Sequence, residues 1–131
     1  MGEKPQYYYY QSGVIPYRWR EGRLEVLLIS SRAQQHWVVP KGIIELGMDA
    51  HESAAKEAYE EAGIRGYTTP LSIGKYSYNK WGGICEVQIF PMRVETILED
   101  WPEKKFRRRE WLPLEQAAER VQEPTLKALL K

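Results

Sequence analysis

The chain has 131 residues, of which 43% are hydrophobic and 28% charged, and its formal net charge is +1. These values are typical of a soluble globular domain and give no reason to expect a nucleic-acid-binding protein. No apolar run approaches the roughly 18 residues of a membrane span, the N-terminus lacks the apolar core of a signal peptide, and a single cysteine excludes an internal disulfide. We therefore expect one cytoplasmic domain over residues 1–131, with residues 1–6 disordered and no membrane partner.

The N-terminal part of the chain predicts two strands. Residues 7–17 mix tyrosines with β-branched residues around Gly13, which predicts a strand whose four consecutive tyrosines alternate between core and surface at a sheet edge. Stacking of these tyrosines on a nucleobase is the alternative. A turn at residues 20–23 leads into residues 24–30, whose apolar run predicts a buried strand.

Polar side chains that suit a phosphate group follow this second strand. Ser30 ends the strand, Arg32 comes two residues later, and Lys41 directly precedes Gly42. Arg32 offers two parallel hydrogen bonds to an anion, and Lys41 offers a point charge. The alternative is that Arg32 and Lys41 are ordinary surface cations.

Residues 49–63 predict a short helix that follows a loop with two glycines. Asp49 and Glu52 match a capping box at its start, and Gly63 suits the left-handed residue that ends a helix. Gly42 and Gly47 allow the preceding backbone to approach a ligand closely or to take a positive φ. The loop can therefore present carbonyl oxygens to a metal ion beside the helix.

Three glutamates share one face of this helix. At about 100° per residue, Glu57, Glu60 and Glu61 project within one sector. The opposite sector, which we expect to pack, carries Ala55, Ala58, Tyr59 and Ala62. Like charges four residues apart and acids in a last helical turn both oppose helix stability. A hard divalent cation such as Mg²⁺, which prefers oxygen ligands, would favour the arrangement, and a solvated acidic face is the alternative.

The rest of the chain predicts further strands and a C-terminal helix. Residues 67–78 and 81–95 predict two strands joined by a turn, and Pro91 suggests that the second is an edge strand or carries a bulge. Cys85 falls in this second strand, where we expect a buried and unreactive thiol. The one basic cluster then enters a short strand at 106–111; its members are Lys104, Lys105, Arg107, Arg108 and Arg109.

An amphipathic helix begins at residues 114–118. Pro124 is expected to interrupt it before a final turn or two at residues 126–131. Strands followed by a helix, more strands and a helix predict an α/β fold, with a mixed sheet covered by helices on both faces.

The segment 42–64 resembles the Nudix hydrolase signature, Gly-x5-Glu-x7-Arg-Glu-U-x-Glu-Glu-x-Gly-U, in which U is apolar. The matching residues are Gly42, Glu57, Ala58, Glu60, Glu61, Gly63 and Ile64. Met48 replaces the first glutamate and Lys56 replaces the arginine. In the family these two residues resemble a structural pair that braces the loop against the helix. We therefore expect Lys56 to turn to Glu52 or Asp49, and we expect the metal site to be retained.

Further motifs extend the resemblance over roughly residues 10–130. They are Ser30-Ser31-Arg32, Trp37-x-Val39-Pro40-Lys41-Gly42, Leu98-Glu99-Asp100-Trp101 and Arg108-Arg109-Glu110-Trp111. They are similar to motifs of the diphosphoinositol polyphosphate phosphohydrolases and diadenosine polyphosphate hydrolases. The resemblance implies a Nudix-type α/β/α sandwich with a mixed central sheet. It also implies a Mg²⁺-dependent hydrolase of phosphoanhydride bonds, with Mn²⁺ as the second candidate ion.

The resemblance also implies roles for individual residues. Glu57, Glu60 and Glu61 are the implied catalytic residues and, with the backbone of Gly42, the implied metal ligands. The implied substrate-binding residues are Ser30, Arg32, Lys41, Gly42, Arg107, Arg108 and Arg109; a plain basic strand edge is the alternative for the last three.

The implied substrates are diadenosine polyphosphates or diphosphoinositol polyphosphates. The alternatives are nucleoside triphosphates, RNA 5′ ends, and a Nudix-fold module that binds a nucleotide without hydrolysing it. Nucleic acid is otherwise not an expected partner, and both a monomer and a homodimer are compatible with the sequence.

Overall fold

The computed structural model describes residues 7–122 and 124–130, so the predicted disorder of residues 1–6 lies outside the described part of the chain. These residues form an eight-stranded mixed sheet and three helices. The strands are β1 (Tyr8–Arg20), β2 (Arg23–Ser30), β3 (Trp37–Val38), β4 (Lys41–Ile43), β5 (Ile64–Tyr67), β6 (Gly74–Lys80), β7 (Gly83–Ile97) and β8 (Arg109–Pro113). The helices are α1 (Ala50–Ala62), α2 (Leu114–Arg120) and α3 (Pro124–Leu129).

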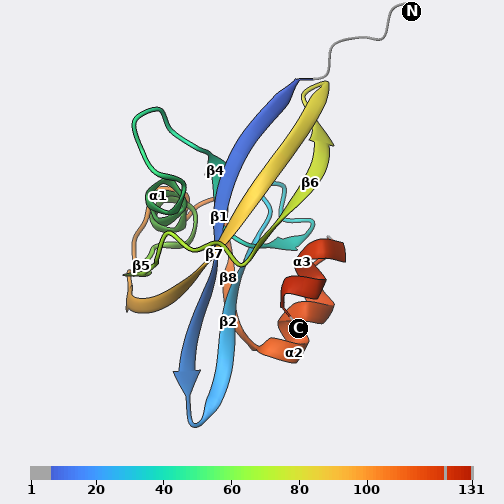
Figure 1. Cartoon of the computed structure of the whole chain (residues 1–131). Coiled ribbons are helices and arrows are strands. Elements are labelled where there is room, and N and C mark those ends of the chain that lie inside the picture. The colour runs from blue at the N-terminus through green and yellow to red at the C-terminus, as the bar shows by residue number, and fades with distance from the viewer. Residues whose placement is uncertain (1–6, 123, 131) are drawn as a thin grey trace, which may run out of the picture.

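Helices cover both faces of the sheet, with α1 on one side and α2 and α3 on the other (Figure 1). The apolar run of β2 contributes to two cores. Leu27 and Ile29 pack beneath α1, whereas Val26 and Leu28 pack beneath α2 and α3. A strand that is buried on both faces reads as a continuous apolar run. The predicted α/β/α sandwich with a mixed sheet is confirmed.

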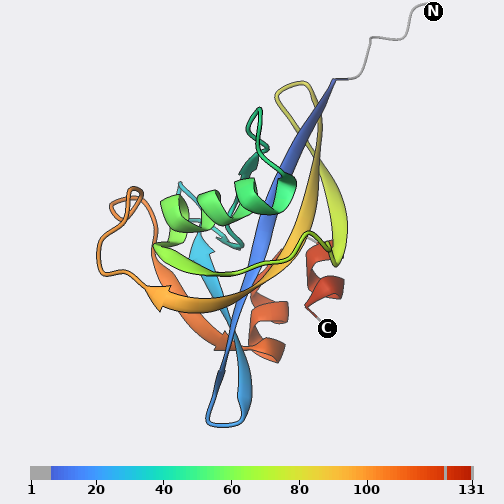
Figure 2. The same cartoon turned by 60° about the vertical axis from the view of Figure 1, so that its left-hand side comes forward.

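β1 and β7 run parallel to each other through the middle of the sheet (Figure 2). β1 as a whole is an interior strand, because it also pairs with β4 from Gln11 and with β2 from Tyr17. Its tyrosine end has a ladder with β7 alone, so the predicted edge position holds for these residues but not for the rest of β1. Tyr8 and Tyr10 lie at the start of this interior strand, where both side chains are exposed and their rings stack. A strand's neighbours depend on distant segments, which a local pattern cannot indicate.

β7 is also an interior strand, in contrast to the edge position suggested by Pro91. On the side away from β1 it pairs with β6 up to Ile89 and with β5 from Arg93 onwards. Pro91 lies between the segments that pair with β6 and with β5. On this side of β7, therefore, no strand pairs with the proline. The register shift in this region falls between Arg65 and Gly66 of β5.

Several boundaries differ from the sequence prediction. The strand predicted over residues 106–111 starts only at Arg109, as β8. The strand predicted over residues 67–78 is split, because β5 starts directly after α1 and β6 starts only at Gly74. Ile64 is fully buried beneath α1. Because this side chain packs in the core directly after the helix, the chain enters the sheet at Ile64. Pro124 does not interrupt a helix but begins α3, a position at which its missing N–H is not needed. Within the described residues, no helix is long and apolar enough to span a membrane.

Candidate active site

α1 begins and ends where the sequence predicts. The backbone N–H of the N-cap Asp49 donates to Glu52 Oε1 at 3.2 Å, and Gly63 ends the helix with φ of 66°. The buried side chains of α1 are Ser53, Ala54, Ala58, Glu61 and Ala62. The buried face of α1 is therefore rotated about the helix axis relative to the predicted face, and it includes Glu61. Ala55 and Tyr59, which were predicted to pack, are only half-buried.

β4 brings Gly42 against the side chain of Glu57. A Cβ atom added at Gly42 would collide with the Glu57 carboxylate. Only glycine therefore allows the strand and this carboxylate to approach so closely. The structure thus brings together two of the residues that the sequence assigned to a metal site.

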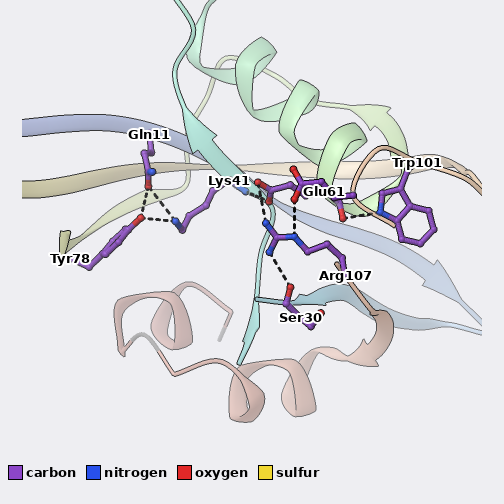
Figure 3. Close-up of polar contacts among 8 residues, drawn as sticks. Gln11, Ser30, Lys41, Glu61, Tyr78, Trp101 and Arg107 are labelled. Atoms are coloured by element: carbon purple, nitrogen blue, oxygen red, sulfur yellow. Dashed lines mark hydrogen bonds and ion pairs between the residues drawn. The ribbon is translucent and has the colours of Figure 1, made fainter. Parts of the chain in front are cut away.

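Glu61 is the most deeply buried acid of α1, with 8% of its surface exposed. Its Oε1 accepts a hydrogen bond from the Lys41 N–H at 3.1 Å, and its Oε2 lies 3.6 Å from the Arg107 guanidinium (Figure 3). Burial raises the pKa of Glu61 to about 8, although the Arg107 charge and the Lys41 N–H act in the opposite direction. Burial also raises the pKa of Glu57, and the charge of Glu60 adds to this effect.

The donor set suits a hard divalent cation. The charge of Glu57 raises the pKa of Glu61, and the charge of Glu60 raises the pKa of Glu57, so like charges repel one another at the site. A bound cation would relieve this repulsion. Among residues 7–122 and 124–130, however, no three His, Cys, Asp or Glu side chains already stand in a metal-binding arrangement. Glu60 instead lies 3.7 Å from Lys56, so the carboxylates would have to rotate to share one ion.

Glu103, in the loop before β8, is a site residue that the sequence reasoning missed. Its N–H donates to the Glu60 carbonyl at 3.0 Å, and its Oε1 accepts from Arg107 Nε at 3.1 Å. Its charge raises the pKa of both Glu57 and Glu61. No spacing pattern connects this loop to α1, and the acidic character of the loop was the only available signal.

The consecutive arginines of the basic cluster have different surroundings. Arg107 reaches the site, where it faces Glu61 and donates to the Ser30 carbonyl at 3.0 Å. Arg108 is exposed, with its guanidinium 5.8 Å from the ring centroid of Trp37. Ser30 is itself buried, and its hydroxyl accepts from the Arg108 N–H at 2.8 Å. The side chain of Ser30 therefore fixes the arginine loop to β2, in contrast to its predicted contact with substrate.

Arg109 does not point into the site. Its guanidinium donates to the carbonyl oxygens of Ala62 at 2.8 Å and Leu98 at 2.6 Å, with a longer bond to Gly63. It also stacks on Trp101, 4.0 Å from the ring centroid. α1 carries no basic residue in its last turn, so this cation from β8 supplies the positive charge that a helix C-terminus favours. These contacts separate Arg109 from the other predicted substrate-binding residues.

A cationic cavity of about 350 Å³ lies beside Glu61. The polar side chains in its lining are those of Gln11, Ser31, Arg32, Lys41, Glu61, Lys80 and Arg107. The structure therefore brings Arg32, Lys41, Gly42 and Arg107 to one cavity, whereas Ser31 lines it in place of Ser30. These four residues were predicted to bind substrate, and they come from three separate segments of the chain that meet at this cavity.

Lys41 lies between this cavity and a second one. Its Nζ donates to Tyr78 Oη at 2.7 Å and to Gln11 Oε1 at 3.3 Å (Figure 3). Burial lowers the pKa of Lys41, and the charge of Lys80 lowers it further. The second cavity, of about 480 Å³, is mainly aromatic and apolar; its lining includes His36, Trp37, Tyr76, Tyr78, Val121 and Leu126. Lys41 and Lys80 line both cavities, so the two meet at these lysines.

Lys56 does not pair with Glu52 or Asp49, the partners predicted from the sequence. Its Nζ lies 2.6 Å from Glu45 Oε1, so the loop and the helix are braced by an acid three residues before Met48. The Glu45 N–H also donates to the buried Ser53 hydroxyl at 3.2 Å. Glu45 therefore supplies the acid that the signature places at position 48, and the loop is still joined to the helix by an ion pair.

We expect Glu45→Gln to reduce the apparent affinity for an activating divalent cation by about 10- to 100-fold, as for other residues that orient metal ligands. The released Lys56 ammonium would then pair more closely with Glu60 and compete with the cation. The measurement is activity as a function of Mg²⁺ or Mn²⁺ concentration. Adding Met48→Glu, which supplies an acid at the signature position, should restore the affinity.

Glu52→Gln is the matched control, because it removes an acid from the same helix without touching the brace. It should keep the capping hydrogen bond, because an amide oxygen can also accept from the Asp49 N–H, and it should leave the cation dependence unchanged. An unchanged cation dependence in Glu45→Gln would show that the Glu45–Lys56 pair does not organise the site.

Comparison with protein families matches residues 10–130 to the NUDIX domain. Nudix hydrolase 21, chloroplastic, of Arabidopsis thaliana is 35% identical over 125 residues, which cover 91% of this chain and 63% of that protein. Diphosphoinositol polyphosphate phosphohydrolase 3-alpha of Mus musculus is 36% identical over 101 residues, which cover 75% of this chain and 60% of that protein. The chain spans a little under two thirds of the length of the first curated relatives it matches.

Solved structures show the same fold. The Ap4A hydrolase of C. elegans has a TM-score of 0.76 and 24% identity, with 93% of this chain and 92% of that chain covered. The NUDIX domain of Shewanella oneidensis NrtR, complexed with ADP ribose, has a TM-score of 0.70 and 14% identity, with 97% and 86% covered. The family match spans nearly all of the residues that form the sheet, its helices and the acidic site. This chain therefore belongs to the NUDIX domain family.

Proposed function

We propose that this protein is a divalent-cation-dependent hydrolase that cleaves a phosphoanhydride bond of a dinucleoside polyphosphate. The observation that carries the proposal is the position of Glu61 in a cationic cavity that meets an aromatic cavity at Lys41 and Lys80. The first cavity suits a chain of phosphates, and the second suits a nucleobase. Mg²⁺ is the proposed ion and Mn²⁺ the alternative.

The cation would be held by the carboxylates of Glu57, Glu60 and Glu61 with the backbone of Gly42. When bound, such an ion neutralises charge on phosphoryl oxygens and lowers the pKa of water. Glu61 is the proposed proton acceptor, because it is the most deeply buried acid of α1 and lines the cationic cavity in which the phosphates would lie. Glu57 is the alternative acceptor.

Substrate phosphates would be oriented by the cations of the first cavity. Arg107 is held in place by Glu103 and by the Ser30 carbonyl, so its guanidinium is already directed at the site. Lys41 uses two of its three donors on Tyr78 and Gln11, which leaves one for a phosphate oxygen. Such preorganised groups place the scissile bond without a further loss of side-chain freedom.

The aromatic cavity favours a nucleobase over an inositol ring. Trp37, Tyr76 and Tyr78 can pack against a flat, uncharged ring. An inositol that carries phosphates around its ring would need cations on all sides, but Lys41 and Lys80 are the only lysines or arginines among the described residues that line this cavity. A diphosphoinositol polyphosphate is the second candidate, because the mouse relative is named as a phosphohydrolase of that substrate class.

The experiment is product analysis by anion-exchange chromatography with Mg²⁺ or Mn²⁺, and with a chelator as the control. The substrates are diadenosine polyphosphates, diphosphoinositol phosphates, nucleoside triphosphates, nucleotide sugars and triphosphorylated RNA. We expect cation-dependent cleavage of diadenosine polyphosphates. Preferential cleavage of diphosphoinositol phosphates would assign the second candidate. Tight binding of a nucleotide without any product would instead identify a non-catalytic binding module.

We propose the cytoplasm as the location on compositional grounds, including the single cysteine. The names of several relatives place them in chloroplasts or mitochondria, so an organelle is the alternative. A monomer and a homodimer both remain compatible with the proposal.

A further inference from the structure

Trp81 occupies a turn position that does not suit a tryptophan. The β6–β7 hairpin closes with Lys80 opposite Gly83, and its two turn residues, Trp81 and Gly82, have φ of 56° and 71°. A two-residue turn with both φ values positive favours Asn-Gly, because a bulky side chain is disfavoured in the left-handed region. Turn geometry alone therefore does not explain this tryptophan.

Core packing does not explain Trp81 either. The residue is 52% exposed. Its ring is nevertheless held in place, since the centroids of the Tyr9 and Trp81 rings lie 5.2 Å apart with the ring planes at 77°, and the Lys80 ammonium lies 4.6 Å from the Trp81 ring centroid. The Tyr9 hydroxyl also donates to the Trp81 carbonyl at 3.4 Å. A tryptophan that is held by these contacts and is still half exposed has ring surface available to stack on a ligand.

Trp81 lies at the cationic cavity. Trp81 lines that cavity together with Arg32, Glu61 and Arg107, but it does not line the aromatic cavity beyond Lys80. The phosphate-binding groups therefore have aromatic surface at two separate places. A substrate with a nucleobase at each end of a phosphate chain presents two aromatic groups in the same way.

We infer that Trp81 stacks on the second nucleobase of a dinucleoside polyphosphate whose first nucleobase occupies the aromatic cavity. The inference rests on the proposed function and adds the means by which a dinucleotide is distinguished from a mononucleotide. Stacking on an indole tolerates any base, so this contact would favour a second nucleoside without selecting its identity. The strained turn would be retained for recognition of the substrate.

The test compares Trp81→Asn with the wild type on diadenosine tetraphosphate and on adenosine tetraphosphate, which lacks the second nucleoside. We expect the KM for diadenosine tetraphosphate to rise about 10-fold, as for loss of one base-stacking contact. The KM for adenosine tetraphosphate should stay unchanged. Because asparagine suits the turn, the Tm of Trp81→Asn should equal or exceed that of the wild type. Trp81→Phe should keep most of the preference.

Trp19→Asn is the matched control, because Trp19 is 66% exposed and lines neither cavity. It should leave both KM values unchanged. Equal KM changes for the two substrates in Trp81→Asn, or no change, would overturn the inference while the hydrolase proposal stands. A wild-type protein that neither cleaves nor binds these nucleotides would overturn both. If Trp81→Asn unfolds, the turn argument is wrong, and Trp81→Phe compared with Trp81→Leu then decides whether an aromatic ring is required.

Discussion

Replacing Glu61 with glutamine is expected to reduce turnover by about 10²- to 10⁴-fold, the usual contribution of a proton-transfer group. The amide keeps the shape of the side chain and can still accept from the Lys41 N–H. It cannot take a proton from water, and it is a weaker ligand for a divalent cation. The measurement is kcat with the substrate identified by product analysis, at saturating Mg²⁺. Unchanged turnover would remove Glu61 from the catalytic residues.

The same variant is expected to be more stable than the wild type above neutral pH when no divalent cation is present. The pKa of Glu61 is about 8 in the folded protein, against an ordinary value of 4.5. Between these values the folded state binds a proton that the unfolded state has released. The free energy of unfolding of the wild type therefore falls as the pH rises through this window. Glu61→Gln removes this dependence, because an amide does not titrate.

Urea denaturation at pH 5 and pH 9 in the presence of a chelator measures this effect. Glu95→Gln is the control, because Glu95 is an exposed acid of β7. The control should keep the slope of the wild type, whereas Glu61→Gln should flatten it. Equal slopes in all three proteins would show that Glu61 is ionised throughout the range in the folded protein. A loss of turnover combined with a gain in stability is the pattern expected of an acid retained for function.

Replacing Arg109 with alanine is expected to destabilise the protein by about 3 kcal/mol, because its charged hydrogen bonds are lost and buried carbonyl groups lose their donor. The carbonyls belong to Ala62 at the end of α1 and to Leu98, the first residue after β7. Arg109→Lys should recover only part of this stability, since an ammonium cannot reproduce the planar stacking on Trp101. The measurement is the midpoint of urea unfolding.

Arg108 is the matched control for Arg109. Arg108→Ala should have little effect on stability, because its side chain is exposed. Arg107→Ala should reduce turnover and also stability, because its guanidinium faces Glu61 and donates to Glu103 and to the Ser30 carbonyl. The KM of folded Arg109→Lys should stay near that of the wild type. A raised KM with unchanged stability in this variant would return Arg109 to the substrate-binding residues.

The sequence was most informative where neighbouring residues decide the structure. The helix that carries the glutamates could be predicted with its caps, because capping and helical periodicity act within a few residues. The continuous apolar run of β2 predicted a buried strand, and the structure shows that both of its faces are covered. The resemblance in the segment 42–64 then led to the family, because Gly42 and the three glutamates keep the spacing of the signature.

Residues that depend on distant partners were not predictable in the same way. The three consecutive arginines look equivalent in the sequence, yet Arg107 faces Glu61, Arg108 is exposed and Arg109 binds the end of α1. Glu103 likewise reaches the site only because its loop folds back onto α1. Alternation along β8 and its preceding loop directs successive side chains to different sides, and only the packing of other elements decides what each side meets.

The sequence by itself determined the α1 helix, its three acids, the glycine that precedes them and the class of fold, because each depends on local propensity or on the apolar pattern. The tertiary structure decided which acid is buried, which acid pairs with Lys56 and which cations surround Glu61. It also placed an aromatic cavity beside the cationic one and Trp81 at the cavity's rim. Burial and pairing depend on segments far apart in the chain, and the free energy of each contact exists only once those segments meet.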